Sequence, residues 1–267
     1  MLKKEQVQFY RDNGFIKLEN VFSDAEFEVI SREYDKVFER KKSQNLEATW
    51  KGDIVRKETQ NKEVSVLSIH NLQYHSSVFT DVITHRRLLD AVQDATGMSD
   101  ILLHHTKAHV KPPEKGAPFP MHQDYHYFPF KKHSMVAVFI HMDDTTPENG
   151  GLAVYPGSHK LGPLEDKGTE IDGMKYHYVD QERFPLSKAT PVLARKGDVL
   201  IFSYLLVHGS YINSSEKERR MLLIQLMSAD DEPLSQTNST PAQGLVLRGE
   251  NVGKDARHAM RFDNKGE

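Results

Sequence analysis

Three residues that can hold a metal lie in two short segments far apart in the chain. His122 and Asp124 form a His-x-Asp pattern, and His208 lies in a Val-His-Gly-Ser segment. On an extended strand the side chains alternate with a period of two, so an imidazole and a carboxylate at this spacing point to the same side. A second imidazole completes two nitrogens and one oxygen on one face of a metal. This set is the facial triad of non-haem Fe(II) oxygenases, which leaves the opposite positions open for a cosubstrate and oxygen.

A strongly basic residue follows the second histidine. Arg219 stands eleven residues after His208 and heads an apolar stretch that reads as a strand. A guanidinium there suits bidentate capture of a carboxylate, such as the distal end of 2-oxoglutarate. Arg220 competes for this role, since adjacent strand residues face opposite ways and both faces of the stretch are largely apolar. Hydropathy therefore does not choose between the two arginines.

Several stretches around these residues resemble the phytanoyl-CoA dioxygenase family. They are residues 8–16 (Gln-Phe-Tyr-Arg-Asp-Asn-Gly-Phe-Ile), 122–130 (His-Gln-Asp-Tyr-His-Tyr-Phe-Pro-Phe), 148–152 (Glu-Asn-Gly-Gly-Leu), 156–159 (Pro-Gly-Ser-His) and 197–219. The resemblance covers about residues 5–230 and is specific at the metal and 2-oxoglutarate positions. It implies a mainly β fold, a double-stranded β-helix (cupin-like jelly roll), that uses Fe(II), 2-oxoglutarate and O2.

The resemblance also implies roles for individual residues. The catalytic iron ligands would be His122, Asp124 and His208. The family spacing favours Arg219 over Arg220 as the 2-oxoglutarate anchor, with Ser210 assisting at the same carboxylate. Related halogenases lack the carboxylate ligand, so Asp124 favours hydroxylation over halogenation.

The activity implied is that of a dioxygenase that hydroxylates an aliphatic C–H of a small molecule and releases succinate and CO2. The family does not fix the substrate, nor does it exclude desaturation or cyclisation. One competing activity is that of an acyl-CoA 2-hydroxylase, which needs a long apolar channel and basic contacts for the CoA phosphates. Candidate contacts are Lys111, Lys115, Lys131 and Lys132. A cupin-like metal-dependent isomerase, which has no use for Arg219, and a non-catalytic binding barrel also fit a triad of this kind.

The strand expected just before the triad carries basic residues on one face. That face holds His105, Lys107, His109 and Lys111. Such a stripe is costly unless it meets water or anions. It predicts a cavity wall in which His105 and Lys107 contact 2-oxoglutarate and His109 contacts an anionic or polar substrate, leaving little apolar wall near the metal. The alternative is an exposed edge strand, where lysines protect against aggregation.

Two further residues are candidates for substrate contact. If the strand stays regular after Asp124, His126 and Phe128 face the metal and the neighbouring tyrosines pack outward. Arg183 lies in the long polar segment 162–191, and loops of this length inside a compact domain are usually lids or binding loops. We therefore expect a substrate role for His126 or Arg183.

The elements expected to position these residues are mainly helices in the first part of the chain and strands in the part that follows. Helices are expected at 4–13, at 24–41 behind a Ser-x-x-Glu capping box, and at 78–97, with a loop or lid at 41–61. Strands are expected at 15–18, 101–111, 135–142, 151–154, 199–202 and 220–227. This order predicts helices that buttress one side of a β-barrel.

Composition bounds the remaining possibilities. The chain has 267 residues, a formal net charge of −3 and no cysteine, so thiolate metal sites are excluded and no bulk charge favours nucleic acid. No apolar run approaches the roughly 20 residues that span a bilayer. We expect one domain over residues 1–267, with a core at about 5–230 and a polar extension at 231–267. The expected location is the cytoplasm, with a small molecule as the only predicted partner.

Overall fold

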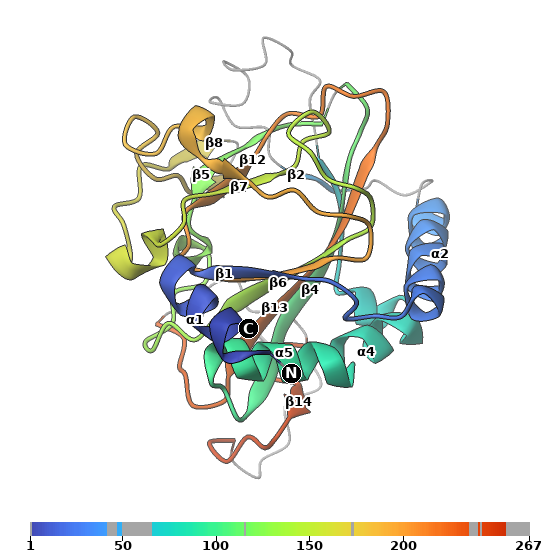
Figure 1. Ribbon diagram of the computed structural model, residues 1–267, viewed down its shortest axis with the longest axis vertical. Coiled ribbons are helices and arrows are strands. Elements are labelled where there is room, and N and C mark those ends of the chain that lie inside the picture. Colours follow the sequence, from blue (N-terminus) through green and yellow to red (C-terminus); the bar gives the residue numbers. More distant parts are fainter. Residues whose placement is uncertain are drawn as a thin grey trace, which may run out of the picture.

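Two antiparallel β-sheets face each other, and helices cover the outer side of the larger one (Figure 1). The computed structural model describes residues 2–41, 47–49, 66–114, 116–171, 174–234, 240 and 242–254. The larger sheet has the strand order β1-β11-β6-β13-β4-β3-β2, with β14 also paired to β4. The smaller sheet has the order β10-β7-β12-β5. This arrangement confirms the mainly β jelly roll with buttressing helices.

The strands of each sheet come from distant parts of the chain. The larger sheet contains β1 (Phe15–Leu18), β2 (Glu47–Thr49), β3 (Val66–His70), β4 (Ile101–Lys111), β6 (Val136–His141), β11 (Val199–Ser203), β13 (Arg219–Ser228) and β14 (Val246–Arg248). The smaller sheet contains β5 (Phe119–His122), β7 (Leu152–Val154), β10 (Thr190–Pro191) and β12 (His208–Ser210). A separate hairpin is formed by β8 (Thr169–Ile171) and β9 (Met174–Tyr176).

The N-terminal helices begin and end where their sequences provide caps. Helix α1 (Lys4–Asn13) ends at Gly14, which adopts the left-handed conformation that glycine takes without steric cost. Helix α2 (Asp24–Lys41) begins after a capping box, in which the backbone N–H of Ser23 donates to Glu26 over 2.7 Å and the N–H of Glu26 donates back to the Ser23 hydroxyl over 3.3 Å. Both predicted helices are confirmed.

The single helix expected at 78–97 is wrong. Two helices occupy this region, α4 (Ser77–Ile83) and α5 (Arg86–Thr96). The hydroxyl of Thr84 bonds back to the carbonyl of Thr80, and His85 is extended, so the chain turns between them. The apolar spacing continues across the break, which is why the pattern alone indicates one helix.

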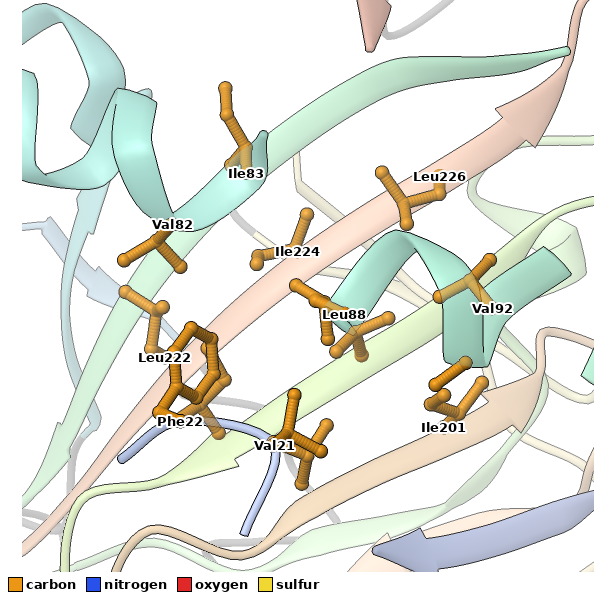
Figure 2. Packing of buried hydrophobic residues seen from close by; sticks show 14 of the residues in the cluster. Val21, Phe22, Val82, Ile83, Leu88, Val92, Ile201, Leu222, Ile224 and Leu226 are labelled. Atoms are coloured by element: carbon orange, nitrogen blue, oxygen red, sulfur yellow. The ribbon is translucent and has the colours of Figure 1, made fainter. Parts of the chain in front are cut away.

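The main core lies between the helices and the outer face of the larger sheet. Figure 2 shows side chains of α4 and α5 packed over those of β13 and β11. The residues of this main core include Val82, Leu88, Val92, Ile201, Leu222, Ile224 and Leu226. Burial of each such side chain is worth about 1.5–3 kcal/mol. Alternate residues of β13 pack instead between the two sheets, with Met221 and Leu223 in a second core. This alternation decides which residues of β13 face the inside.

Two expectations for the connecting segments need correction, and a third falls mostly on residues that the structure does not describe. The segment 162–191 contains the β8–β9 hairpin and the short strand β10. The segment after residue 230 is not entirely irregular, because β14 pairs with β4 at Leu102 and Ile101. The loop expected at 41–61 lies outside the described residues except for residue 41 and β2, which pairs with β3. These strands are too short to show a period of two in the sequence.

Short 3-10 turns complete the elements. Three of them are η1 (Leu72–Tyr74), η2 (Asp124–His126) and η3 (Ser158–Leu161), and a fourth, η4, spans Leu186–Lys188. Of these, η2 matters most for the site, because it follows β5 directly.

Within the described ranges, no helix is both long enough and apolar enough to pass through a bilayer.

Candidate metal centre

Two strands of the smaller sheet bring the three predicted ligands together. His122 ends β5, His208 begins β12, and the two residues are direct partners in the antiparallel register. Asp124 begins η2 immediately after β5. Its Oδ1 lies 3.6 Å from Nε2 of His122 and 3.7 Å from Nε2 of His208, and the three donor atoms lie within 4.8 Å of one another. One cation placed among them would contact two nitrogens and one oxygen.

Hydrogen bonds set the tautomers of both imidazoles. Nδ1 of His122 lies 2.7 Å from the carbonyl oxygen of Pro120, and Nδ1 of His208 lies 2.9 Å from that of Leu206. A carbonyl only accepts, so each Nδ1 carries the proton and each Nε2 presents its lone pair toward Asp124. Burial, reinforced by the neighbouring His122, lowers the pKa of His208 to about 4. His208 is therefore neutral at physiological pH, as a metal ligand must be.

The carboxylate is held by a residue that the motif did not reveal. Nε2 of Gln225, on β13, donates to Oδ2 of Asp124 over 2.7 Å, which leaves Oδ1 facing the two imidazoles. Burial acts to raise the pKa of Asp124, but at the acidic pH where this carboxyl titrates the protonated imidazoles of His208 and His122 outweigh burial and hold that pKa below its usual value. The carboxyl group is therefore ionised and fixed in orientation. The one sequence signal for Gln225 is that it shares a strand face with Arg219.

A cavity of about 150 Å³ opens beside the triad, between the two sheets. Its polar lining comes from His105, Lys107, His109, His122, Asp124, His208, Ser210, Arg219 and Gln225. Its apolar lining includes Phe119, Phe128, Phe139, Leu152, Met221 and Leu223. The expectation of little apolar wall near the metal is therefore wrong, because β6, β7 and β13 contribute large apolar side chains. Among the described residues that line it, Asp124 is the single acid.

The basic face of β4 lines this cavity. His105, Lys107 and His109 all face it, while Ala108 and Val110 belong to the core under the helices. Strand β4 lies between β13 and β3, so the exposed edge-strand alternative is wrong. Burial lowers the pKa of His105 and of His109 well below the usual range, so both imidazoles are neutral. They offer hydrogen bonds rather than charge.

The two arginines of β13 lie in different surroundings. Arg220 points away from the cavity and pairs with Asp143 at 2.6 Å and Asp35 at 2.6 Å. Arg219 is 2% exposed, lines the cavity, and has only the sulfur of Met221, at 4.0 Å, as a hydrogen-bond partner among the described residues. Its Nε has no partner there, and burial lowers its pKa to about 10.

A buried guanidinium without an acid partner fits an anionic ligand. Arg219 makes no ion pair with an acid of the described residues. Leaving such a charge buried and unpaired is strongly unfavourable, whereas a carboxylate would satisfy its donor fork. Ser210, the third residue of β12, lines the same cavity. The residues present therefore fit the distal carboxylate of 2-oxoglutarate, with its other end toward the triad.

Two candidate substrate residues do not reach the cavity. Strand β5 ends at residue 122 and η2 follows, so the period of two expected beyond it is lost. Phe128 lines the cavity as expected, and Tyr127 lines it in place of His126. The ring of His126 instead stacks on that of His177, with the ring centres 5.8 Å apart. Arg183 is exposed, with its guanidinium 5.0 Å from the ring centre of Phe184.

Comparisons with known proteins agree with this geometry. The family model for phytanoyl-CoA dioxygenase matches residues 10–221. The peroxisomal phytanoyl-CoA dioxygenase of Bos taurus is 31% identical over 251 residues, 89% of this chain and 74% of that protein. A probable alpha-ketoglutarate-dependent hypophosphite dioxygenase of Stutzerimonas stutzeri is 28% identical over 239 residues, 86% of this chain and 80% of the relative.

The fold is also similar to those of solved structures. One is the epimerase SnoN, crystallised with Fe3+, alpha ketoglutarate and nogalamycin RO. It superimposes with a TM-score of 0.70 at 20% sequence identity, covering 93% of this chain and 96% of SnoN. At this identity the likeness shows the shared fold.

Proposed function

The chain belongs to the phytanoyl-CoA dioxygenase family and is a non-haem Fe(II)- and 2-oxoglutarate-dependent dioxygenase; on that premise we propose that His122, Asp124 and His208 are its iron ligands. The convergence of their three donor atoms supports this assignment. Gln225 is not among the proposed ligands, but its side-chain amide donates to the Asp124 carboxylate and fixes the orientation of that ligand.

Iron, 2-oxoglutarate and O2 together supply an oxidation that converts 2-oxoglutarate to succinate and CO2 and hydroxylates an aliphatic C–H. We assign cosubstrate binding to Arg219 and Ser210, which hold the distal carboxylate. The observation that carries this assignment is the buried Arg219, which has no acid partner in the described part of the chain. Apolar side chains that line the same cavity, such as Phe139 and Leu152, help to exclude water from it.

For the substrate we propose a small polar or anionic molecule. Support comes from Lys107, flanked by His105 and His109 on the cavity wall, and from the hypophosphite dioxygenase among the relatives. The sequence also predicts contact of His105 and Lys107 with 2-oxoglutarate, and their position allows either contact. The single acid on the described lining, Asp124, belongs to the metal site, so an anion meets little repulsion.

The competing activities receive less support. Two lysines considered for CoA phosphates, Lys131 and Lys132, pair with Glu232 and Asp230 at the surface, and Lys111 is buried. Lys115 lies outside the described residues. An isomerase or a binding barrel that used the same triad would not need a buried arginine without an acid partner, such as Arg219, beside it.

The test is succinate release from 2-oxoglutarate by Fe(II)-loaded protein, with branched acyl-CoAs, amino acids, amines and phosphonates as trial substrates. We expect one polar or anionic class to stimulate release, and His122→Ala and Arg219→Ala to abolish it. Arg183→Ala, at an exposed arginine, is the control and should leave release unchanged. Stimulation by acyl-CoAs alone would overturn the substrate proposal, and no succinate with iron bound would overturn the cosubstrate assignment.

We also propose that the whole chain forms one catalytic domain, supported by the pairing of β14 with β4. Limited proteolysis should then release no stable fragment that lacks the segment of β14. The cytoplasmic location stays a prediction of the sequence.

A further inference from the structure

A buried lysine lies directly across from the cosubstrate arginine. Lys111, at the end of β4, is the register partner of Arg219 on β13, so both side chains project from the same face of the sheet. Lys111 is 1% exposed and Arg219 is 2% exposed. Neither makes an ion pair with an acid of the described residues. Two adjacent buried cations without an acid are costly unless an anion joins them.

Among the described residues, the side chain of Lys111 makes two hydrogen bonds, one to Ser210 at the end of β12 and one to Tyr211, which follows it. Its Nζ donates to Oγ of Ser210 over 2.7 Å and to the carbonyl oxygen of Tyr211 over 2.6 Å. Because Ser210 accepts from Lys111, its own O–H must donate elsewhere. Ser210 lines the cavity, and Lys111 stands behind it. The direction left for this O–H is the cavity, toward the ligand that Arg219 faces.

The surrounding backbone makes room for this lysine. A Cβ on Gly150 would lie 2.9 Å from Cδ of Lys111, and a Cβ on Gly116 would lie 2.8 Å from its Cβ. Gly150 also has a φ of +82°, which side chains rarely adopt. The side-chain amide of Asn213 donates to the carbonyl oxygen of Lys111 over 3.1 Å. The lysine is therefore seated by several segments that meet at this point.

We infer that Lys111 is a positioning residue of the cosubstrate site, holding the Ser210 hydroxyl toward the distal carboxylate of 2-oxoglutarate and placing a second positive charge behind it. The inference rests on the proposed function of this cavity. Burial, with a smaller contribution from Arg219, lowers the pKa of Lys111 well below its usual value. A carboxylate in the cavity has the opposite effect, so ligand and lysine charge stabilise each other.

A purely structural role makes a different prediction. If Lys111 only joins β4 to β12, its loss lowers stability and leaves the affinity of the folded protein for 2-oxoglutarate unchanged. If it serves the cosubstrate site, its loss weakens 2-oxoglutarate binding and raises KM for 2-oxoglutarate more than it lowers kcat. The two roles therefore separate in a binding measurement.

The experiment measures the Kd of 2-oxoglutarate for Ni(II)-loaded protein by calorimetry, together with the Tm of the metal-free protein. The variants are Lys111→Met, which removes charge and donors, and Lys111→Gln, which keeps a donor without charge. Lys188→Met, at a surface lysine, is the matched control. We expect Lys111→Met to raise Kd about 10- to 100-fold, the value of a hydrogen bond to a charged group, and Lys111→Gln to raise it less. In a Ser210→Ala background, Lys111→Met should raise the Kd of 2-oxoglutarate clearly less, because the lysine acts through the Ser210 hydroxyl.

A Kd within twofold of the wild type for both lysine variants would overturn the inference. If Lys111→Met does not fold, Lys111→Gln decides it alone. A wild-type protein that binds no 2-oxoglutarate would instead refute the proposed function.

Discussion

Replacing Gln225 with leucine tests whether an amide that bonds to the Asp124 carboxylate strengthens metal binding at the triad. The change removes the N–H that donates to Oδ2 of Asp124 over 2.7 Å and keeps a similar volume on the buried face of β13. The carboxylate then loses its orienting partner and can rotate away from His122 and His208. We expect weaker metal binding and a fold that remains intact.

The magnitude follows from the character of this hydrogen bond. A hydrogen bond to a charged group contributes about 1.5–3 kcal/mol, and its buried setting places this one in the upper part of that range. Since each 1.4 kcal/mol is a factor of about ten, the metal Kd should rise about 10- to 100-fold. The Oε1 of Gln225 has no partner in the described structure, so leucine also removes an unsatisfied buried atom. This gain offsets only part of the stability lost with the bond to Asp124, so the Tm of the metal-free protein should fall modestly.

The assay is competition for Co(II) or Ni(II) against a chromophoric chelator, with Fe(II)-dependent succinate release as a second readout. Gln225→Glu keeps the shape but replaces the donor with an acceptor, and it should weaken binding at least as much. Gln8→Leu, on the exposed side of α1, is the control. An unchanged metal Kd in Gln225→Leu would refute the reasoning, because Asp124 would then not depend on this bond.

Three other predictions follow from the same structure. Arg219→Ala should raise KM for 2-oxoglutarate at least about 100-fold in steady-state kinetics, and an effect below about tenfold would contradict its role as anchor. Arg220→Ala should instead lower the Tm and leave that KM within about twofold, since its partners are structural acids outside the cavity; a large change in KM would reverse the assignment. Ser23→Ala removes the cap that bonds Glu26 and should destabilise the protein by about 1 kcal/mol in urea denaturation with kinetics unchanged; no loss of stability would show that the cap contributes nothing.

Some features of the site could be predicted because they depend on local chemistry. The spacing of His122 and Asp124, the context of His208 and the basic face of β4 are properties of short segments. The structure brings the three donors of the triad together and turns that face inward. The fold implied by the resemblance is confirmed. The choice of Arg219 over Arg220 as cosubstrate anchor stays a proposal, supported by the position of Arg219 on the cavity lining and by the ion pairs of Arg220 outside it.

Other features depended on how separate segments meet. The expected position of His126 failed because the strand ends at His122, and no local pattern marks that end. The role proposed for Gln225 depends on β13 lying beside η2, and the role proposed for Lys111 depends on the contacts of β4 with β13 and β12. The bonds from Gln225 to Asp124 and from Lys111 to Ser210 join distant parts of the chain, which no periodicity records.

The sequence by itself determined the candidate donors and their order along the chain, because these are properties of residue type and spacing. It also determined the elements that have caps or long alternating patterns, because these follow from backbone preferences over a few residues. Only the tertiary structure decided which polar side chains orient the donors, where the apolar cavity wall lies and which cations are buried together. These depend on burial and on pairing across the two sheets, and a buried charge or amide takes its meaning from the groups that surround it.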